Sequence, residues 1–361
     1  MNGGEVILRK VIKTALIGFG MAGRVFHSPI ISSLDSFELD KIYTTNAESI
    51  KTIETLYPNT RVVSDMQEIL CDESISLVVI AAPNTQHFVL AKQVILAGKH
   101  VVVDKPFTVT SAEADELISL ANKHGKVMSI FQNRRWDSDF KTITKVIESG
   151  LLGNLVECEI HMDRFRKNIK DRAWREENIP GSGVLYDLGS HLIDQALTLF
   201  GTPNAITADL RMQRQIAKTI DNYELILHYD KLKVTLKSGM LVRAALPHFI
   251  LLGENGSFVK YGVDIQEEDL KAGLTPLTKT NWGEEPEELY GTICTTANGL
   301  DIDGKIKSEK GDYREYYLNI HDAIANNAGL IVTPQQASNT IRLIEYAMKS
   351  NQERCTINVS L

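Results

Sequence analysis

The sequence predicts an α/β protein with two domains. An N-terminal Rossmann dinucleotide-binding domain, residues 1–131, precedes an α/β domain, residues 132–361, with a large open and mostly antiparallel sheet. Strand-like and helical segments alternate through the first third of the chain, which is typical of a parallel, doubly wound sheet. After about residue 131, runs with one apolar and one polar face predict strands of a half-open sheet. The length of 361 residues suits two ordinary domains.

Short apolar runs predict six strands in the first domain. They are Thr14–Ile17, Phe37–Tyr43, Arg61–Val63, Leu77–Ala81, His100–Val103 and Val127–Ile130. Helices are expected between them. Two of these, Thr85–Ala97 and Ser111–His124, are each followed by a glycine that can take the left-handed conformation of a helix end. Strands that are apolar throughout, such as Leu77–Ile80, are expected to be covered on both faces.

The second domain begins with a helical pattern and continues with alternating strands. A helix is expected over Asp137–Ser149, followed by strands over 156–162, 223–229 and 231–237, and helices over Tyr313–Asn326 and Pro334–Lys349. The stretch Gln266–Lys310, rich in Gly, Pro, Thr and acidic residues, is predicted to be a long excursion of loops. Because an open sheet face is a common dimerisation surface, we expect a homodimer or homotetramer.

Composition excludes several classes of protein. The net charge of −7 gives no reason to expect a nucleic-acid or membrane partner. No run approaches the roughly 20 apolar residues that span a bilayer. The N-terminus lacks a signal core, so we expect a cytoplasmic protein. Four cysteines without metal or redox spacing predict no metal site.

The most informative motif is Gly-x-Gly-x-x-Gly, which follows the first strand and opens a helix expected over Met21–Ser33. The first glycine allows the tight turn, the second lets the backbone approach a pyrophosphate, and the third lets the helix pack on the strand. A dinucleotide is therefore expected to contact Gly18, Phe19, Gly20, Met21, Ala22 and Gly23.

Two further strand ends are expected to meet the cofactor. After the second strand, Thr44, Thr45 and Asn46 stand where NAD sites favour a carboxylate for the ribose hydroxyls, so the sequence favours NADP over NAD. The exit of the fourth strand offers small and polar residues along the cofactor's path. These are Ala81, Pro83, Asn84 and His87, while the neighbouring Thr85 could instead cap the next helix.

The motif Asp104-Lys105-Pro106 follows the fifth strand, at the sheet edge where ligands bind in this architecture. Lys105 could hold a hydroxyl or polarise a carbonyl beside the nicotinamide, and it is a candidate for both catalysis and cofactor binding. A cis bond before Pro106 would aim Lys105 inward. The alternative is a solvated lysine in a turn.

A third motif places Asp187, His191 and Asp194 on one helical face, at spacings of four and three residues. A carboxylate beside an imidazole can orient it and tune its pKa, and His191 could then exchange a proton with an alcohol. The alternative is that Asp187 caps the helix and His191 is a core histidine.

The three motifs together resemble the glucose–fructose oxidoreductase/inositol dehydrogenase/rhizopine-catabolism (Gfo/Idh/MocA) family, with Asp104 where the family usually has Glu. The resemblance implies an acid/base role for His191, a polarising role for Lys105 and a supporting role for Asp187. Segments Asn133–Phe140 and Tyr186–Leu199 resemble the branch that includes NADP-dependent scyllo-inositol dehydrogenases. Candidate substrate-binding residues are Asn133, Arg164, Trp174, Asp187 and His191, although surface pairing or packing would equally explain the first three.

The resulting hypothesis is an NAD(P)-dependent dehydrogenase. It would transfer a hydride between the nicotinamide and a secondary alcohol or ketone of a cyclitol or sugar. Two alternatives stay open: a glycosidase that uses bound NAD in a redox-neutral cycle, and an NAD(P)-sensing regulatory protein without turnover. The intact set of Lys105, Asp187 and His191 argues against the sensor, which needs no acid/base.

Overall fold

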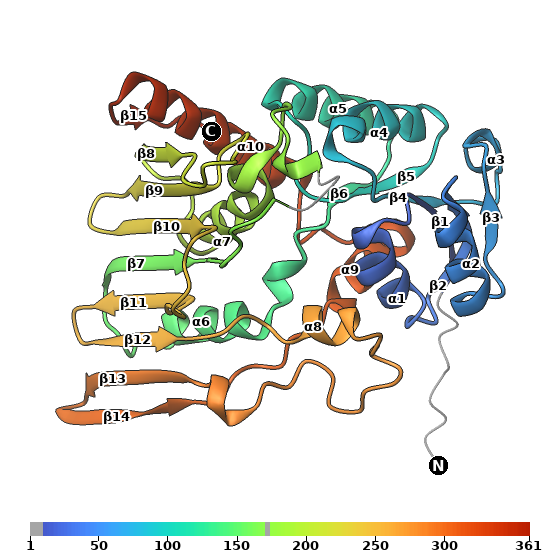
Figure 1. Ribbon diagram of the computed structural model, residues 1–361. Coiled ribbons are helices and arrows are strands. Elements are labelled where there is room, and N and C mark those ends of the chain that lie inside the picture. The colour runs from blue at the N-terminus through green and yellow to red at the C-terminus, as the bar shows by residue number, and fades with distance from the viewer. Residues whose placement is uncertain (1–9, 170–173) are drawn as a thin grey trace, which may run out of the picture.

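The computed structural model describes residues 10–169 and 174–361 and contains two sheets that lie side by side (Figure 1). The first has six parallel strands in the order β3-β2-β1-β4-β5-β6. Their bounds are β1 Ile12–Ile17, β2 Phe37–Tyr43, β3 Arg61–Val63, β4 Leu77–Ile80, β5 His100–Val103 and β6 Met128–Ile130. This order confirms the predicted doubly wound sheet and places its topological switch point between β1 and β4.

Helices cover both faces of this sheet. They are α1 Ser28–Ile31, α2 Ala47–Leu56, α3 Gln67–Leu70, α4 His87–Leu96 and α5 Ser111–Lys123. The helix expected over Met21–Ser33 is not uniform, since a π-helical turn over Ala22–His27 precedes α1. The Ser28 N–H donates to the carbonyl of Gly23, five residues earlier, and Pro29 follows it with no N–H to donate. The proline explains why the usual α-helical hydrogen bonding does not run straight through this point.

The second sheet has nine strands in the order β14-β13-β12-β11-β7-β10-β9-β8-β15. Among these, β7 and β10 pair in parallel and the other neighbours are antiparallel, which confirms the predicted sheet type. The strands are β7 Leu155–His161, β8 Ala205–Arg211, β9 Asn222–His228, β10 Lys233–Gly239, β11 Phe249–Gly253, β12 Gly256–Lys260, β13 Gly291–Ala297, β14 Leu300–Ile306 and β15 Ile357–Asn358.

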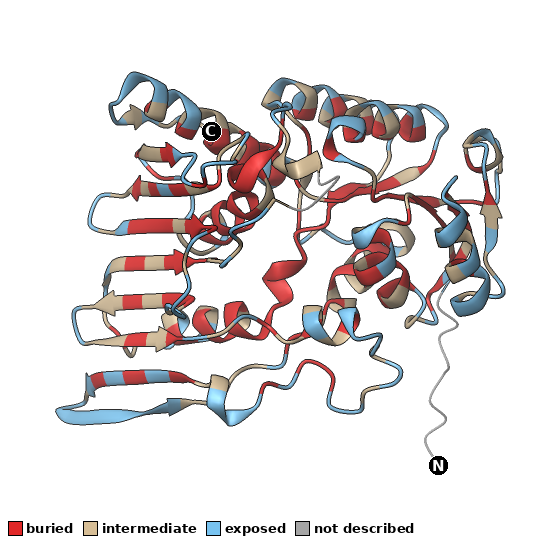
Figure 2. Ribbon diagram, in the orientation of Figure 1, coloured by how far each residue is buried: buried red, intermediate tan, exposed pale blue. Residues whose placement is uncertain are grey.

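Five helices accompany the second sheet in the chain. They are α6 Ser138–Glu148, α7 Ser190–Phe200, α8 Gln266–Lys271, α9 Arg314–Asn326 and α10 Pro334–Glu353. Buried residues of α6, α7 and α10 share one hydrophobic core with this sheet, and Figure 2 shows burial running along its central strands. Helix α9 packs elsewhere, because Tyr313 at its start, Tyr316 and Tyr317 belong to a core with β1 and β2 of the first sheet. The division between residues 131 and 132 stays a prediction.

The loop prediction for Gln266–Lys310 was wrong in two places. The stretch contains α8 and the β13–β14 hairpin. Strand β13 alternates buried and exposed residues, but Gly, Thr and Cys occupy much of it, so its apolar pattern is weak. Asn298 and Gly299, both with positive φ, join the two strands. An Asn-Gly pair is a strong hairpin signal, which the composition of the surrounding stretch obscured.

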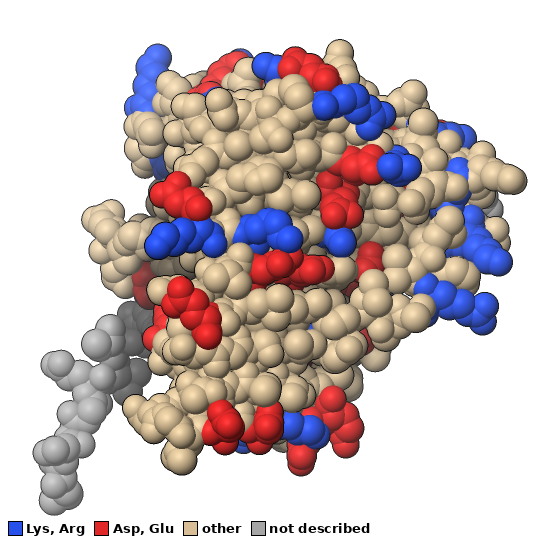
Figure 3. Space-filling model, turned by 90° about the vertical axis from the view of Figure 1, so that its left-hand side faces the viewer, with Lys and Arg blue, Asp and Glu red and all other residues tan. Residues whose placement is uncertain are grey.

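Charges on the outer surface are interspersed. On the face shown in Figure 3, Lys and Arg side chains lie beside Asp and Glu side chains rather than in a patch of one sign. No helix within residues 10–169 and 174–361 is both long and apolar enough to cross a membrane.

A buried ion pair joins the segment after β6 to two helices. The Arg135 guanidinium donates to both carboxylate oxygens of Asp194 on α7, at 2.8 and 2.7 Å. It also donates to the Ile331 carbonyl and to Gln336 at the start of α10. Arg135 and Asp194 are 8% and 2% exposed, so neither charge has water as an alternative partner. Asp194 therefore serves this junction rather than the imidazole of His191, which the sequence placed near it.

We predict that Asp194→Ala lowers the free energy of unfolding by about 3–5 kcal/mol, because it leaves the buried Arg135 guanidinium without its carboxylate. Urea unfolding followed by circular dichroism measures the effect. The matched control is Asp209→Ala, which breaks an exposed pair with Arg211 and should change stability little. Equal losses in the two variants would contradict the structural role of the buried pair.

Candidate active site

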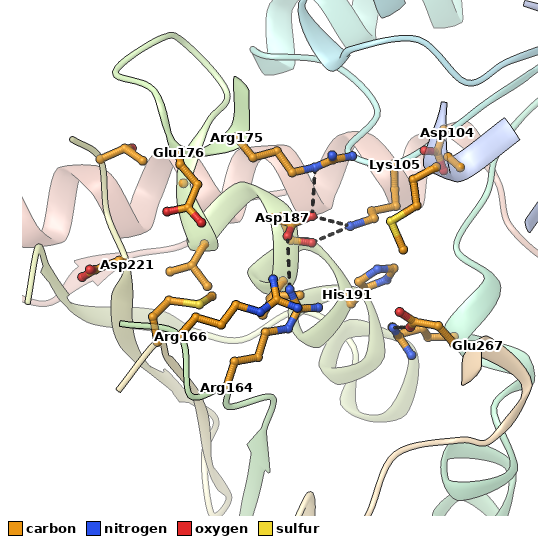
Figure 4. Close-up of a pocket in the computed structure, with 18 of the residues that line it drawn as sticks. Asp104, Lys105, Arg164, Arg166, Arg175, Glu176, Asp187, His191, Asp221 and Glu267 are labelled. Carbon is orange, nitrogen blue, oxygen red and sulfur yellow. Dashed lines mark hydrogen bonds and ion pairs between the residues drawn. The ribbon is translucent and has the colours of Figure 1, made fainter. Parts of the chain in front are cut away.

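A cavity of about 270 Å³ opens beside the carboxyl ends of the first sheet's strands. This volume is close to the lower end of the range for small-molecule sites. The first domain contributes Met21, Ala22, Asp104 and Lys105. The second domain contributes residues from the segment that follows β7, from the turn before α7 and from α7 itself (Figure 4). The cavity therefore brings the three sequence motifs together, at the edge where an α/β sheet binds its ligands.

The glycine-rich turn has the shape that a dinucleotide requires. Gly18 has a φ of +95°, and a Cβ there would lie 2.6 Å from the Ala81 carbonyl oxygen. A Cβ on Gly23 would lie 2.2 Å from the carbonyl oxygen of Gly18, so the turn and the following helix pack closely. Gly20 has no such neighbour within 4 Å, which leaves open space on its surface. The residues thus fit a pyrophosphate beside Gly20, with Met21 and Ala22 at the cavity wall and Phe19 buried behind the turn.

Thr44, Thr45 and Asn46 form the link between β2 and α2. The Asn46 side chain caps α2 by accepting from the Ser49 N–H at 2.8 Å, and the Thr44 hydroxyl accepts from the Asn46 N–H at 3.3 Å. Thr45 and Asn46 are exposed, whereas Thr44 is buried. At the end of β2 the structure therefore places two hydroxyl groups, an amide and a helix N-terminus. None of these three side chains is a carboxylate.

Residues in the link between β4 and α4 hold neighbouring segments of the site together. Ala81 and Pro83 lie in this link, and the buried Asn84 donates to the Gly181 carbonyl at 2.7 Å, across the two domains. His87 is 1% exposed, and its ring nitrogens lie 2.9 Å from the carbonyl oxygens of Ala82 and Pro106. Burial lowers the pKa of His87. His87 thus connects the link after β4 to the link after β5. Thr85 does not cap α4, which begins without a side-chain cap.

Lys105 points into the cavity from the end of β5. The Lys105–Pro106 peptide bond is cis, as the Asp104-Lys105-Pro106 motif predicts. The Lys105 ammonium donates to the backbone carbonyl of Asp187 at 2.6 Å and to its carboxylate at 3.1 Å. Burial lowers the pKa of Lys105, although the nearby carboxylate opposes that effect. Lys105 is thus not the solvated turn lysine of the alternative interpretation.

Asp187 faces three cations rather than the imidazole. Its carboxylate lies 3.1 Å from Lys105, 3.3 Å from Arg175 and 3.9 Å from Arg164. Burial alone would raise the pKa of Asp187, but these cations hold it well below its usual range. The expectation that this carboxylate orients His191 was wrong, because the three cations attract it. Nor does Asp187 cap a helix, since it lies within a π-helical turn over Leu185–Gly189 that runs directly into α7.

His191 presents a neutral imidazole to the cavity. It is 4% exposed, and its Nδ1 atom has no hydrogen-bond partner among the described residues. Burial lowers its pKa well below the ordinary value, and the charges of Lys105, Arg134 and Arg164 lower it further. A neutral imidazole can accept a proton, which is the property that a general base requires.

Two of the three remaining candidate substrate-binding residues line the cavity and the third does not. Asn133 and Arg164 line the cavity, whereas Trp174 does not and instead lies beneath the Arg175 guanidinium, 4.5 Å from its ring centre. Trp174 therefore positions Arg175.

Sequence reasoning missed most of the charged lining. The missed residues are Arg134, Arg166, Arg175, Glu176, Arg214, Asp221, Glu267 and Lys271. Three of these arginines form ion pairs: Arg134 with Glu267 and Arg214 with Glu176, each at 2.6 Å, and Arg175 with Asp187 at 3.3 Å. A signal existed for Arg166, because residues two apart in an extended segment share a face with each other, and Arg164 had already been singled out.

Comparison with known proteins agrees with this geometry. Residues 12–132 match the model of an oxidoreductase-family NAD-binding Rossmann fold, and residues 144–359 match the model of the C-terminal alpha/beta domain of the same family, Gfo/Idh/MocA. The chain is 41% identical to scyllo-inositol 2-dehydrogenase (NADP(+)) IolW of Bacillus subtilis, over 97% of each protein. It is also 41% identical to the uncharacterized oxidoreductase YdgJ of Escherichia coli, over 96% of this chain and 98% of that protein.

Solved structures give the same result. The oxidoreductase yvaA of Bacillus subtilis superposes with a TM-score of 0.93 at 39% identity, covering 98% of this chain and 99% of the other. An oxidoreductase of Bacteroides fragilis superposes with a TM-score of 0.88 at 41% identity, covering 97% of this chain and 100% of the other. The chain therefore belongs to the Gfo/Idh/MocA oxidoreductase family and is an NAD(P)-dependent dehydrogenase.

Proposed function

We propose that the protein transfers a hydride between NADP and a secondary alcohol or ketone of a cyclitol or sugar. The observation that supports this most directly is the neutral imidazole of His191, whose Nδ1 atom has no hydrogen-bond partner among the described residues, in the same cavity as the Lys105 ammonium. Similarity to a relative named as an NADP-dependent scyllo-inositol dehydrogenase supports the same substrate class. Hydroxyl-rich substrates need many hydrogen-bond partners when buried, and the polar lining offers them.

The geometry supports the following division of roles. The bound nicotinamide supplies the hydride acceptor in oxidation and the donor in reduction. In oxidation His191 accepts the hydroxyl proton of the substrate, while Lys105 donates a hydrogen bond to the same oxygen as negative charge develops there. In reduction the protonated His191 returns the proton. Asp187 positions Lys105 through the two hydrogen bonds that it accepts.

The preference for NADP rests on the end of β2. An NAD-specific site uses a carboxylate to bind the ribose hydroxyls, and the same carboxylate would repel a 2′-phosphate. The hydroxyl of Thr45, exposed beside the N-terminus of α2, would instead donate to the phosphate. Gly18, Gly20 and Gly23 would hold the pyrophosphate between this end and the catalytic residues.

We expect His191→Ala and Lys105→Ala each to lower kcat by about a hundred- to ten-thousandfold, because each removes a group that handles the reacting proton or oxygen. Absorbance of reduced nicotinamide, with NADP⁺ and a panel of inositols and aldoses, measures this. The control His228→Ala changes a histidine on β9 that does not line the cavity and should leave kcat unchanged. Cofactor binding without turnover of any polyol would contradict the proposal and favour a sensor or a redox-neutral hydrolase.

The lowered pKa of His191 predicts the pH profile. A depressed pKa keeps the imidazole neutral as pH falls, so kcat/KM for alcohol oxidation should stay level between about pH 8 and pH 6. Lys105→Met removes a nearby positive charge, which should raise the pKa of His191 and move the acid limb of the residual activity upward. A wild-type acid limb at the ordinary histidine value would show that the cavity charges and burial do not lower the pKa of His191.

Thr45→Asp should shift cofactor preference toward NAD⁺, since the new carboxylate repels a 2′-phosphate. We expect KM for NADP⁺ to rise about tenfold or more while KM for NAD⁺ stays similar or falls. The control Thr55→Asp introduces the same charge at an exposed position near the far end of α2. If the ratio of the KM values for NADP⁺ and NAD⁺ is unchanged in Thr45→Asp, the turn after β2 does not bind the 2′-phosphate.

A further inference from the structure

Positive charge exceeds negative charge in the cavity. Seven cationic side chains and five carboxylates line it within the described residues, although the whole chain carries a net charge of −7. Two of these carboxylates, Glu176 and Asp221, already bind Arg214. Glu267 binds Arg134 and Lys271. The cations that remain are Lys105, Arg164, Arg166 and Arg175.

Asp187 faces three of these cations, and a fourth, Arg166, lies beside Arg164. The remaining lining carboxylate, Asp104, acts on Lys105. Lys105 and Arg175 contact Asp187 directly, at 3.1 and 3.3 Å. Arg164 reaches it only at 3.9 Å, beyond hydrogen-bond distance, and Arg166 forms no ion pair with any described residue. In Figure 4 the Arg164 and Arg166 side chains extend toward the same part of the cavity, below Asp187.

The backbone holds the two arginines in place. They lie on an extended segment that continues β7, where the Arg164 N–H donates to the Gly239 carbonyl at 2.9 Å and the Arg166 N–H to the Met240 carbonyl at 2.8 Å. Residues two apart on an extended segment point to the same side. Phe165, between them, is 42% exposed and points away. The pair is therefore presented to the cavity by the sheet rather than by a loose loop.

The two neighbouring guanidinium groups carry like charges that repel each other. Burial lowers the pKa of Arg164, and the like charge of Arg166 contributes to that shift. Both side chains are half-buried, with 27% of the Arg164 side chain exposed, so water solvates the two charges only in part and a nearby counter-charge would stabilise them. An anionic group of the substrate would supply the counter-charge that the described residues do not.

We propose that the substrate is a polyhydroxy acid, whose carboxylate binds Arg164 and Arg166 while one of its hydroxyl carbons faces Lys105 and His191. The inference rests on the proposed function and narrows its substrate class from neutral polyols to sugar acids. Planar guanidinium groups match the planar carboxylate, and a carboxylate adds little volume to a sugar in a cavity of about 270 Å³.

The test measures binding rather than turnover. With NADPH bound, an alcohol cannot be oxidised, so D-gluconate forms a dead-end complex whose Kd calorimetry can measure. Sorbitol is its neutral match, with the same carbon chain and hydroxyl configuration but a CH₂OH group in place of the carboxylate. We expect gluconate to bind about tenfold more tightly than sorbitol, and added salt to reduce this difference. Equal affinities would overturn the proposal.

Variants assign the effect to the arginines. Arg166→Gln should weaken gluconate binding about tenfold and sorbitol binding less than twofold, which also shows that the variant folds. Arg166→Lys keeps the charge and should retain part of the preference. The control Arg211→Gln removes an exposed charge on β8 and should change neither Kd. A gluconate preference that survives both Arg164→Gln and Arg166→Gln would overturn the assignment.

Two further outcomes separate the hypotheses. Sorbitol 6-phosphate is the third ligand, and binding of this phosphate in clear preference to gluconate would overturn the carboxylate assignment. Arginine-dependent gluconate binding in a protein that oxidises neither a neutral polyol nor a sugar acid would support the anion site and contradict the proposed function. Turnover of neutral inositols without measurable gluconate binding would support the proposed function and overturn the anion site.

Discussion

The ion pair between Lys105 and Asp187 is the interaction on which the site depends. Lys105 follows β5 directly, and Asp187 lies in the turn before α7, so one contact joins the first sheet to the helical layer of the second. Each charge is largely buried, and the lysine would lose its contacting carboxylate without Asp187. The pair therefore fixes the position of the lysine and the relation between the cofactor-binding edge and the substrate side of the cavity.

The same pair explains the state of His191. The Asp187 carboxylate is shared among Lys105, Arg175 and Arg164, so it is not available to stabilise an imidazolium. The positive charges around the cavity disfavour a further one, and burial acts in the same direction. A neutral histidine beside a cationic lysine results from charge balance across the whole cavity, and needs no dedicated partner on the imidazole ring.

Local motifs predicted the parts of the site that depend on local geometry. The glycine turn, the inward Lys105 and the cavity position of His191 follow from strand ends and helix starts, which leave their pattern in the sequence. The partner of Asp187 could not be predicted in this way, because Arg164 and Arg175 come from segments that only the folded chain brings near it. Helical spacing also assumed a regular helix, whereas Asp187 lies in a π-helical turn.

The fold shows the same limit. Parallel strands covered on both faces are apolar throughout and were predicted correctly, but β8, β11 and β12 were not identified from pattern alone. The strand β13 is rich in threonine and is held in the sheet by its pairing with β12 and β14. Such a strand depends on its neighbours more than on its own composition.

Charge in the cavity also couples binding to chemistry. The guanidinium of Arg164 is one of the charges that lower the pKa of His191. An anion bound at Arg164 would offset part of that positive potential, and the pKa of His191 would rise toward its ordinary value. A base with a higher pKa accepts a proton more readily, provided that it is still neutral at the working pH. An anionic substrate would therefore improve the base that acts on it, whereas a neutral polyol would leave that base as the free protein has it.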